Sequence, residues 1–271
     1  MTFIVGMRCS DGIVILADTL ESGGVVKRYR QKVHAENVIA GWGVAWGVAG
    51  NAHVADKFSQ KLRELLGHDF YECHKTELVV ERCLKWIRQQ YSGPDEDIDV
   101  ILGMFGTSRR DPRSRGVSTP TPEQYLYRAD SLTGCLAPVK DYYTAGMDVT
   151  LATFILENMR NPFGYIDEAI RLGVFATAVM KKYATGVGGD TNGFVYRLGI
   201  DGWAPVLERD ILEIELSFPV VALERCASEF WMNHPKARNN AEMLSSQLRI
   251  TKSLGRRGSK QSASRKSKLK Q

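Results

Sequence analysis

The chain has 271 residues, of which 44% are hydrophobic and 25% charged, with a net charge of +5 at pH 7. This composition predicts one large domain that buries a full core without metals or disulfides. Five cysteines without close pairing and five scattered histidines indicate neither a disulfide framework nor a metal site, so we expect no cofactor. The sequence has no apolar run of about 18 residues and no secretory signal, so we expect a soluble, cytoplasmic protein without membrane contacts.

The first predicted strand covers residues 2–7 and begins with Thr2. Threonine is small enough for Met1 to be removed, which would leave a free α-amino group and a hydroxyl on one residue. An α-amine titrates near pH ~8, so it can accept the hydroxyl proton at neutral pH. Because many chains begin with Met-Thr by chance, the terminus alone does not establish a nucleophile.

The second predicted strand, residues 13–18, follows the Asp-Gly turn at residues 11–12 and ends at Asp18. Pairing across the turn brings Asp18 level with the start of the chain. A carboxylate that ends an apolar strand needs a cation partner. Lys32, in a third short strand after a Gly-Gly turn, is the best candidate. The alternative interpretation is an ordinary turn aspartate and a solvated lysine.

The next apolar strand, residues 45–50, leads directly into a helix that begins at Asn51. The Gly50 peptide N–H lies near the start of this helix and has no side chain in front of it. Such a donor is suited to stabilise an oxyanion. The alternative is a tight strand-to-helix junction without a catalytic role.

The remaining elements follow from apolar periodicity and from glycine and proline breaks. We expect helices over residues 51–66, 80–91, 149–159 and 165–182, and strands over residues 99–106, 124–128, 142–146, 194–200 and 203–206. The order of strands and helix pairs predicts an α+β fold with two stacked sheets between helix layers, a four-layer αββα sandwich.

Taken together, these features resemble the proteasome-type N-terminal nucleophile (Ntn) hydrolases over about residues 2–206. The likeness is carried by a terminal threonine, the Asp-Gly hairpin, Ala17-Asp18, Lys32-Val33 and the segment 48–50. It indicates a β-type subunit, most similar to bacterial proteasome-like peptidases, and implies an Ntn-type sandwich. By position, it also implies that the threonine is nucleophile and base, that Asp18 and Lys32 form a charge network, and that the Gly50 amide binds the oxyanion.

The chain departs from the family pattern in two turns. The family's Gly-Ser-Gly turn corresponds to residues 144–148, which contain Gly146 and Asp148 but no serine. The family's Asp-x-x-Ser-Gly loop corresponds to residues 188–193, where Asp190 or Asn192 would substitute. Because such groups orient the terminal amine, their alteration bears on the rate of the reaction. The segment from Asp18 to Lys32 is also about two residues shorter than the family pattern.

The resemblance implies a threonine endopeptidase that assembles into a self-compartmentalised homo-oligomeric ring. Unfolded polypeptide or peptides would be its substrates, with an ATPase as a partner. If the register around Lys32 is as expected, Arg30, His34 and Val48 line the pocket for the substrate side chain.

We assign residues 1–235 to the Ntn-like domain and residues 236–271 to a basic, disordered tail. After His234, eleven Lys or Arg residues and one Glu give a net charge of +10. One alternative function is therefore an inactive proteasome-fold scaffold or polyanion-binding protein that uses this tail. Another is a small-molecule amidohydrolase, because an N-terminal nucleophile also cleaves non-peptide amides.

Overall fold

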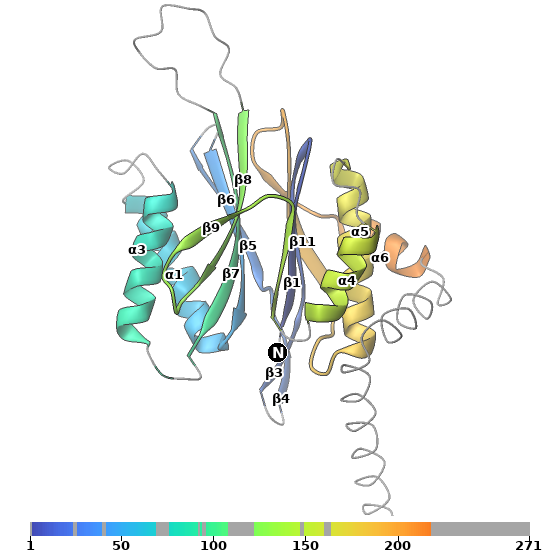
Figure 1. The fold of residues 1–271 in the computed structure, drawn as a ribbon, viewed down its shortest axis with the longest axis horizontal. Coiled ribbons are helices and arrows are strands. Elements are labelled where there is room, and N and C mark those ends of the chain that lie inside the picture. The colour runs from blue at the N-terminus through green and yellow to red at the C-terminus, as the bar shows by residue number, and fades with distance from the viewer. Residues whose placement is uncertain are drawn as a thin grey trace, which may run out of the picture. The chain divides into compact units, whose positions relative to one another are not determined.

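The computed structural model describes most of the chain up to residue 217 (Figure 1). The described residues are 2–23, 26–39, 42–68, 76–91, 93, 96–107, 122–146, 149–159 and 164–217. The expected domain end at residue 235 and the basic tail 236–271 lie outside these residues. The described part combines helices with three antiparallel sheets, which confirms the predicted mixture of α and β structure.

The first large sheet has the strand order β10-β1-β2-β11-β12. Its strands are β1 (Phe3–Cys9), β2 (Gly12–Asp18), β10 (Tyr142–Gly146), β11 (Thr191–Arg197) and β12 (Trp203–Pro205). The predicted hairpin is present, with Cys9 opposite Gly12 and Ile4 opposite Ala17. Because β1 and β2 are central strands covered on both faces, they are apolar almost throughout rather than alternating.

The second large sheet has the order β5-β6-β7-β8-β9. Its strands are β5 (Val33–Ile39), β6 (Trp42–Gly50), β7 (Ile98–Thr107), β8 (Pro122–Asp130) and β9 (Leu136–Val139). A core cluster that includes Ile4 and Ile15 of the first sheet and Ala45 and Ile101 of the second joins the two sheets. At Gly47 a Cβ atom would lie 2.8 Å from the Ile4 side chain, so this glycine permits close packing of the sheets.

A third, two-stranded sheet consists of β3 (Leu20–Gly23) and β4 (Val26–Tyr29). We did not predict this hairpin: its strands carry charged residues and lack an apolar alternation. Lys32 lies after it, in the link that leads into β5. The expected third strand around Lys32 therefore begins only at Val33.

Helices cover the outer faces of both large sheets (Figure 1). These are α1 (Ala52–His68), α3 (Thr76–Gln90), α4 (Val149–Met159), α5 (Ile166–Tyr183) and α6 (Glu208–Ser217). Helices α1 and α3 pack on the second sheet through a core that contains Trp46, Phe58, Leu62 and Leu84. Helix α5 packs on β1 and β2, and α4 on β10. Helix α6, which we did not predict, contacts α5 and β11. Among the described helices, none has the length and apolar character to cross a membrane.

Candidate active site

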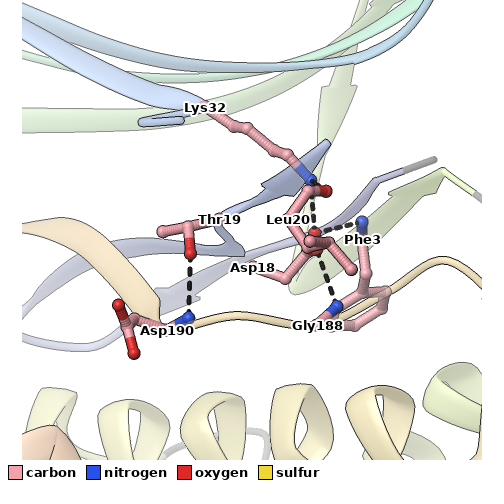
Figure 2. Close-up of polar contacts among 7 residues, drawn as sticks. All are labelled: Phe3, Asp18, Thr19, Leu20, Lys32, Gly188 and Asp190. Carbon is pink, nitrogen blue, oxygen red and sulfur yellow. Dashed lines mark hydrogen bonds and ion pairs between the residues drawn. The ribbon is translucent and has the colours of Figure 1, made fainter. Parts of the chain in front are cut away.

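The carboxylate of Asp18 is the centre of a buried polar cluster at the end of β2 (Figure 2). Its Oδ1 accepts hydrogen bonds from the Phe3 backbone N–H at 2.8 Å and from Lys32 Nζ at 2.9 Å. Its Oδ2 accepts one from the Gly188 backbone N–H at 3.0 Å. Three donors from separate segments thus satisfy a fully buried charge, which would otherwise be costly in this core.

Lys32 is also buried, and its ammonium group bridges two parts of the chain. Besides the ion pair with Asp18, Nζ donates to the Leu20 carbonyl oxygen. Burial lowers the pKa of Lys32 below its ordinary value, while the Asp18 charge and hydrogen bond oppose this shift. The sequence argument for a cation beside Asp18 matches the observed contact, although the catalytic roles of both residues stay a prediction.

Thr2 lies directly before β1, next to this cluster, and is mostly buried. It lines a cavity of about 230 Å³ together with Lys32 and Gly50. Asp18 is not part of the lining, but it contacts Lys32, which is. The structure therefore brings three of the four predicted residues to one cavity and places the fourth in contact with one of them.

Gly50 lies at the end of β6, immediately before α1, and its φ angle is +111°. A Cβ atom at this position would collide with the Asp97 carbonyl oxygen, so only glycine fits without strain. Asn51 is the N-cap of the helix: its Oδ1 accepts hydrogen bonds from the backbone N–H groups of His53 and Val54. Gly50 thus borders the cavity at a helix N-terminus, where partial positive charge favours an anion.

Gly146, one of the four supporting positions, lies against Thr2. It pairs with Phe3 across β10 and β1, and its φ angle is +110°. A Cβ atom there would overlap the Thr2 carbonyl oxygen, so this glycine allows the turn to approach the start of the chain. Asp148 lies outside the described residues.

Asp190 and Asn192 do not contact Asp18 through their side chains. The Asp190 side chain is exposed, and only its backbone takes part: its N–H donates to Thr19 Oγ1 at 2.8 Å (Figure 2). The Asn192 Oδ1 is buried and has no hydrogen-bond partner in the described part of the chain. That either side chain takes the place of the family serine in orienting the terminal amine stays a prediction.

Two residues that sequence reasoning missed hold this loop in place. Thr19 accepts the Asp190 N–H with its hydroxyl and donates its own backbone N–H to the Asp190 carbonyl. Gly188 donates to Asp18 and accepts from the Leu20 N–H. Gly188 acts only through backbone groups, which leave no signature in a sequence, and Thr19 acts through both its backbone and its hydroxyl.

The cavity lining also includes the charged residues Glu21 and Arg30 and the titratable residue His34. The Arg30 guanidinium contacts Asp56 of α1 and lies 3.8 Å from the Glu21 carboxylate of β3. His34, also in the lining, has its pKa lowered to about 4, first by burial and then by the positive charges of Arg63 and Arg30. Arg30, His34 and Val48, which we expected around the substrate side chain, all line this cavity.

Within the described ranges, no group of three or more His, Cys, Asp or Glu side chains is arranged to hold a metal ion.

Neither a protein-family model nor a curated protein matches the sequence. Several solved structures match the fold. Anbu (ancestral beta-subunit) from Yersinia bercovieri has a TM-score of 0.63 and 14% identity, covering 83% of this chain and 96% of that one. A Gly-1 mutant of Anbu from Hyphomicrobium sp. strain MC1 has a TM-score of 0.63 and 15% identity, with 84% and 99% covered. The structure of the helical assembly of the Anbu complex from Pseudomonas aeruginosa has a TM-score of 0.63 and 16% identity, with 84% and 96% covered.

These comparisons correct the expected family assignment. Membership among proteasome β-type subunits or bacterial proteasome-like peptidases is wrong, because no family model matches and the similar structures named above are Anbu proteins at 14–16% identity. The features that suggested it, such as the Asp-Gly hairpin and the glycine before α1, are required by the local geometry of the fold. They specify the fold and not one family within it.

Proposed function

We propose that this protein is a threonine peptidase whose nucleophile is the Thr2 hydroxyl, made available by removal of Met1. The observation that carries the proposal is the shared cavity of Thr2, Lys32 and Gly50, with Asp18 hydrogen-bonded to Lys32. We also propose that the fold is an Ntn-type four-layer αββα sandwich. The packing of α1 on β5 and β6, of α5 on β1 and β2, and the similarity of the fold to Anbu support this.

The proposed reaction is acyl transfer to the hydroxyl of Thr2 after removal of Met1. The α-amine of Thr2 accepts the hydroxyl proton, directly or through water, while Oγ1 bonds to the carbonyl carbon of a peptide. The Gly50 N–H stabilises the oxyanion. When the tetrahedral species collapses, the C–N bond breaks and the leaving amine takes the proton. Water then hydrolyses the ester and restores the hydroxyl.

Lys32 has an electrostatic part in this proposal. A nearby ammonium group disfavours protonation of the α-amine, so the amine stays available as a base near neutral pH. The ion pair with Asp18 keeps the lysine oriented, since both side chains are buried and hydrogen-bonded. Asp18 and Lys32 thus act on the amine through charge and position.

We further propose that the protein forms a closed homo-oligomer in the cytoplasm, which encloses the cavities and admits unfolded polypeptide with the help of an ATPase. The Anbu complex from Pseudomonas aeruginosa forms a helical assembly, so at least one protein of similar fold self-associates. Light scattering of the purified protein tests this part: a monomer would contradict the enclosed chamber.

Intact mass spectrometry after incubation with a peptide epoxyketone tests the nucleophile. This reagent reacts with the α-amine and the hydroxyl of an N-terminal threonine, so an adduct on a chain without Met1 is the expected result. The Thr2→Ala variant should form no adduct and should hydrolyse fluorogenic peptides at less than about 1% of the parental rate.

A matched control is Ser10→Ala, which removes an exposed hydroxyl at the opposite end of the same hairpin. This variant should be labelled and should hydrolyse peptides like the parent. Retention of Met1 in the active preparation, or parental hydrolysis by Thr2→Ala, would refute the proposed function.

A further inference from the structure

The cavity beside Thr2 is bordered by an uneven set of charges. Glu21 and Arg30 both line it, and both side chains are partly exposed, at 29% and 28%. Arg30 contacts Asp56, which reaches it from α1. Two carboxylates thus share one guanidinium group at this side of the cavity.

The other titratable groups of the lining, Lys32 and His34, add no net positive charge to the cavity. The Lys32 charge is neutralised by Asp18 at 2.9 Å. His34 is uncharged at pH 7, because its pKa is lowered to about 4. Asp56 lies outside the lining but contacts Arg30 directly, so it offsets the guanidinium charge and leaves Glu21 as the lining carboxylate without a full counter-charge.

The contacts of Arg30 show why Glu21 lacks a full counter-charge. The distance from its Oε2 to Arg30 is 3.8 Å, too long for a hydrogen bond, whereas Asp56 contacts the guanidinium directly. In the described part of the chain, this is the only ion pair of Glu21. Its carboxylate therefore retains acceptor capacity at the cavity.

Three apolar residues of the lining suit an aliphatic stem, beside the polar Gln31, Asn51 and Ser59. Val48, Ala52 and Ala55 contribute short apolar side chains from the end of β6 and the first turn of α1. Lysine and arginine combine such a stem with a charged end, and they commonly lay the stem along apolar surface while the charge reaches a polar group.

We infer that this cavity selects a lysine or arginine side chain on the residue whose carbonyl is attacked, with Glu21 as the group that binds its charge. This inference rests on the proposed function, since it assigns the substrate class of the same site. Glu21 then determines specificity, while Thr2 and Gly50 act on the peptide bond.

The experiment compares two fluorogenic peptides that are identical except for arginine or leucine before the cleaved bond. The parent should show a kcat/KM for the arginine peptide roughly ten-fold above that for leucine, as expected for a charge-assisted hydrogen bond. Glu21→Gln, which keeps the shape of the side chain, should remove this ratio, and Glu21→Lys should favour a third peptide with glutamate. The control Glu64→Gln changes an exposed carboxylate on α1 that pairs with Lys61 and should keep the parental ratio.

A binding measurement separates the two proposals. Calorimetry with acetyl-Leu-Leu-Arg-amide on Thr2→Ala should show binding that weakens about ten-fold when Glu21→Gln is added. If hydrolysis is absent but this binding and its loss are observed, the peptidase proposal fails and the subsite stands. If peptides are cleaved without preference for arginine, or if Glu21→Gln leaves the ratio unchanged, the subsite inference is overturned and the peptidase stands. If neither hydrolysis nor arginine-dependent binding is found, both are overturned.

Discussion

The Asp18–Lys32 pair offers the sharpest test of the site's energetics. Asp18→Asn keeps the side-chain volume but removes the charge, which leaves the Lys32 ammonium buried without its partner. The amide also presents an N–H group to one of the three donors that now face the carboxylate. Breaking a buried ion pair from one side costs about 3–5 kcal/mol. For a domain of this size, the midpoint of thermal unfolding should therefore fall by roughly 6–20 °C.

A double-mutant cycle isolates the pair. Lys32→Met removes the cation and should cost about 3–5 kcal/mol as well, since Asp18 is then unpaired. The double variant Asp18→Asn/Lys32→Met has no buried charge left, so its loss of unfolding free energy should be clearly smaller than the sum of the two single losses. Urea denaturation followed by tryptophan fluorescence measures all four free energies.

Additive losses of unfolding free energy would refute the proposed coupling between Asp18 and Lys32. If the double variant loses as much as the two single variants together, the two charges are not coupled, and the contact at 2.9 Å has no energetic consequence.

Two further predictions concern the cavity and the turn beside it. Gly146→Ala should lower the unfolding free energy by a few kcal/mol and abolish hydrolysis, because the added Cβ overlaps the Thr2 carbonyl oxygen. The control Gly134→Ala also has a positive φ but nothing within 4 Å, so it should cost only about 1 kcal/mol of backbone strain. Equal losses of the two variants in urea denaturation would disprove the contact. The pKa of His34, about 4 in the folded state against 6.5 unfolded, means that the unfolded state binds more protons between these values, so the unfolding free energy rises with pH across this window. His34→Gln should flatten the rise between pH 4.5 and 7 by about 1–2 kcal/mol after allowance for solvent screening, and an unchanged slope would contradict the burial of the imidazole.

The predictable parts of the fold are those where one apolar pattern determines one structure. Val54, Phe58 and Leu62 recur at helical spacing and are all buried in α1. Helix α6 lacks such a pattern: among its residues only Ile211 is buried, while Leu212 and Leu216 are exposed. The β3–β4 hairpin is similarly short and charged, so neither element had an apolar period from which to predict it.

In the candidate site, a contact between charged side chains was predictable, whereas contacts made by backbone groups were not. The contact of Asp18 with Lys32 was predictable because a carboxylate within an apolar strand requires a cation. The role of the Gly50 N–H as a donor to an oxyanion stays a prediction. The loop around Gly188 was not predictable in its detail. Its contribution to Asp18 is a backbone N–H from 170 residues away, and any residue type except proline supplies the same donor.

Thr2 itself is positioned by its neighbours on both sides. The next residue, Phe3, donates its backbone N–H to Asp18, and Gly146 packs against the carbonyl group of Thr2. The donors to Asp18 come from the start of β1, the link before β5 and the loop before β11, so one buried charge requires three distant segments to be in place. Because a buried ion pair is tolerated only when its hydrogen bonds are satisfied, the position of the chain's first residues depends on the folding of the whole described domain. Residues near a chain end commonly fray, and here Thr2 and Phe3 are held by contacts with the core and not by local structure alone.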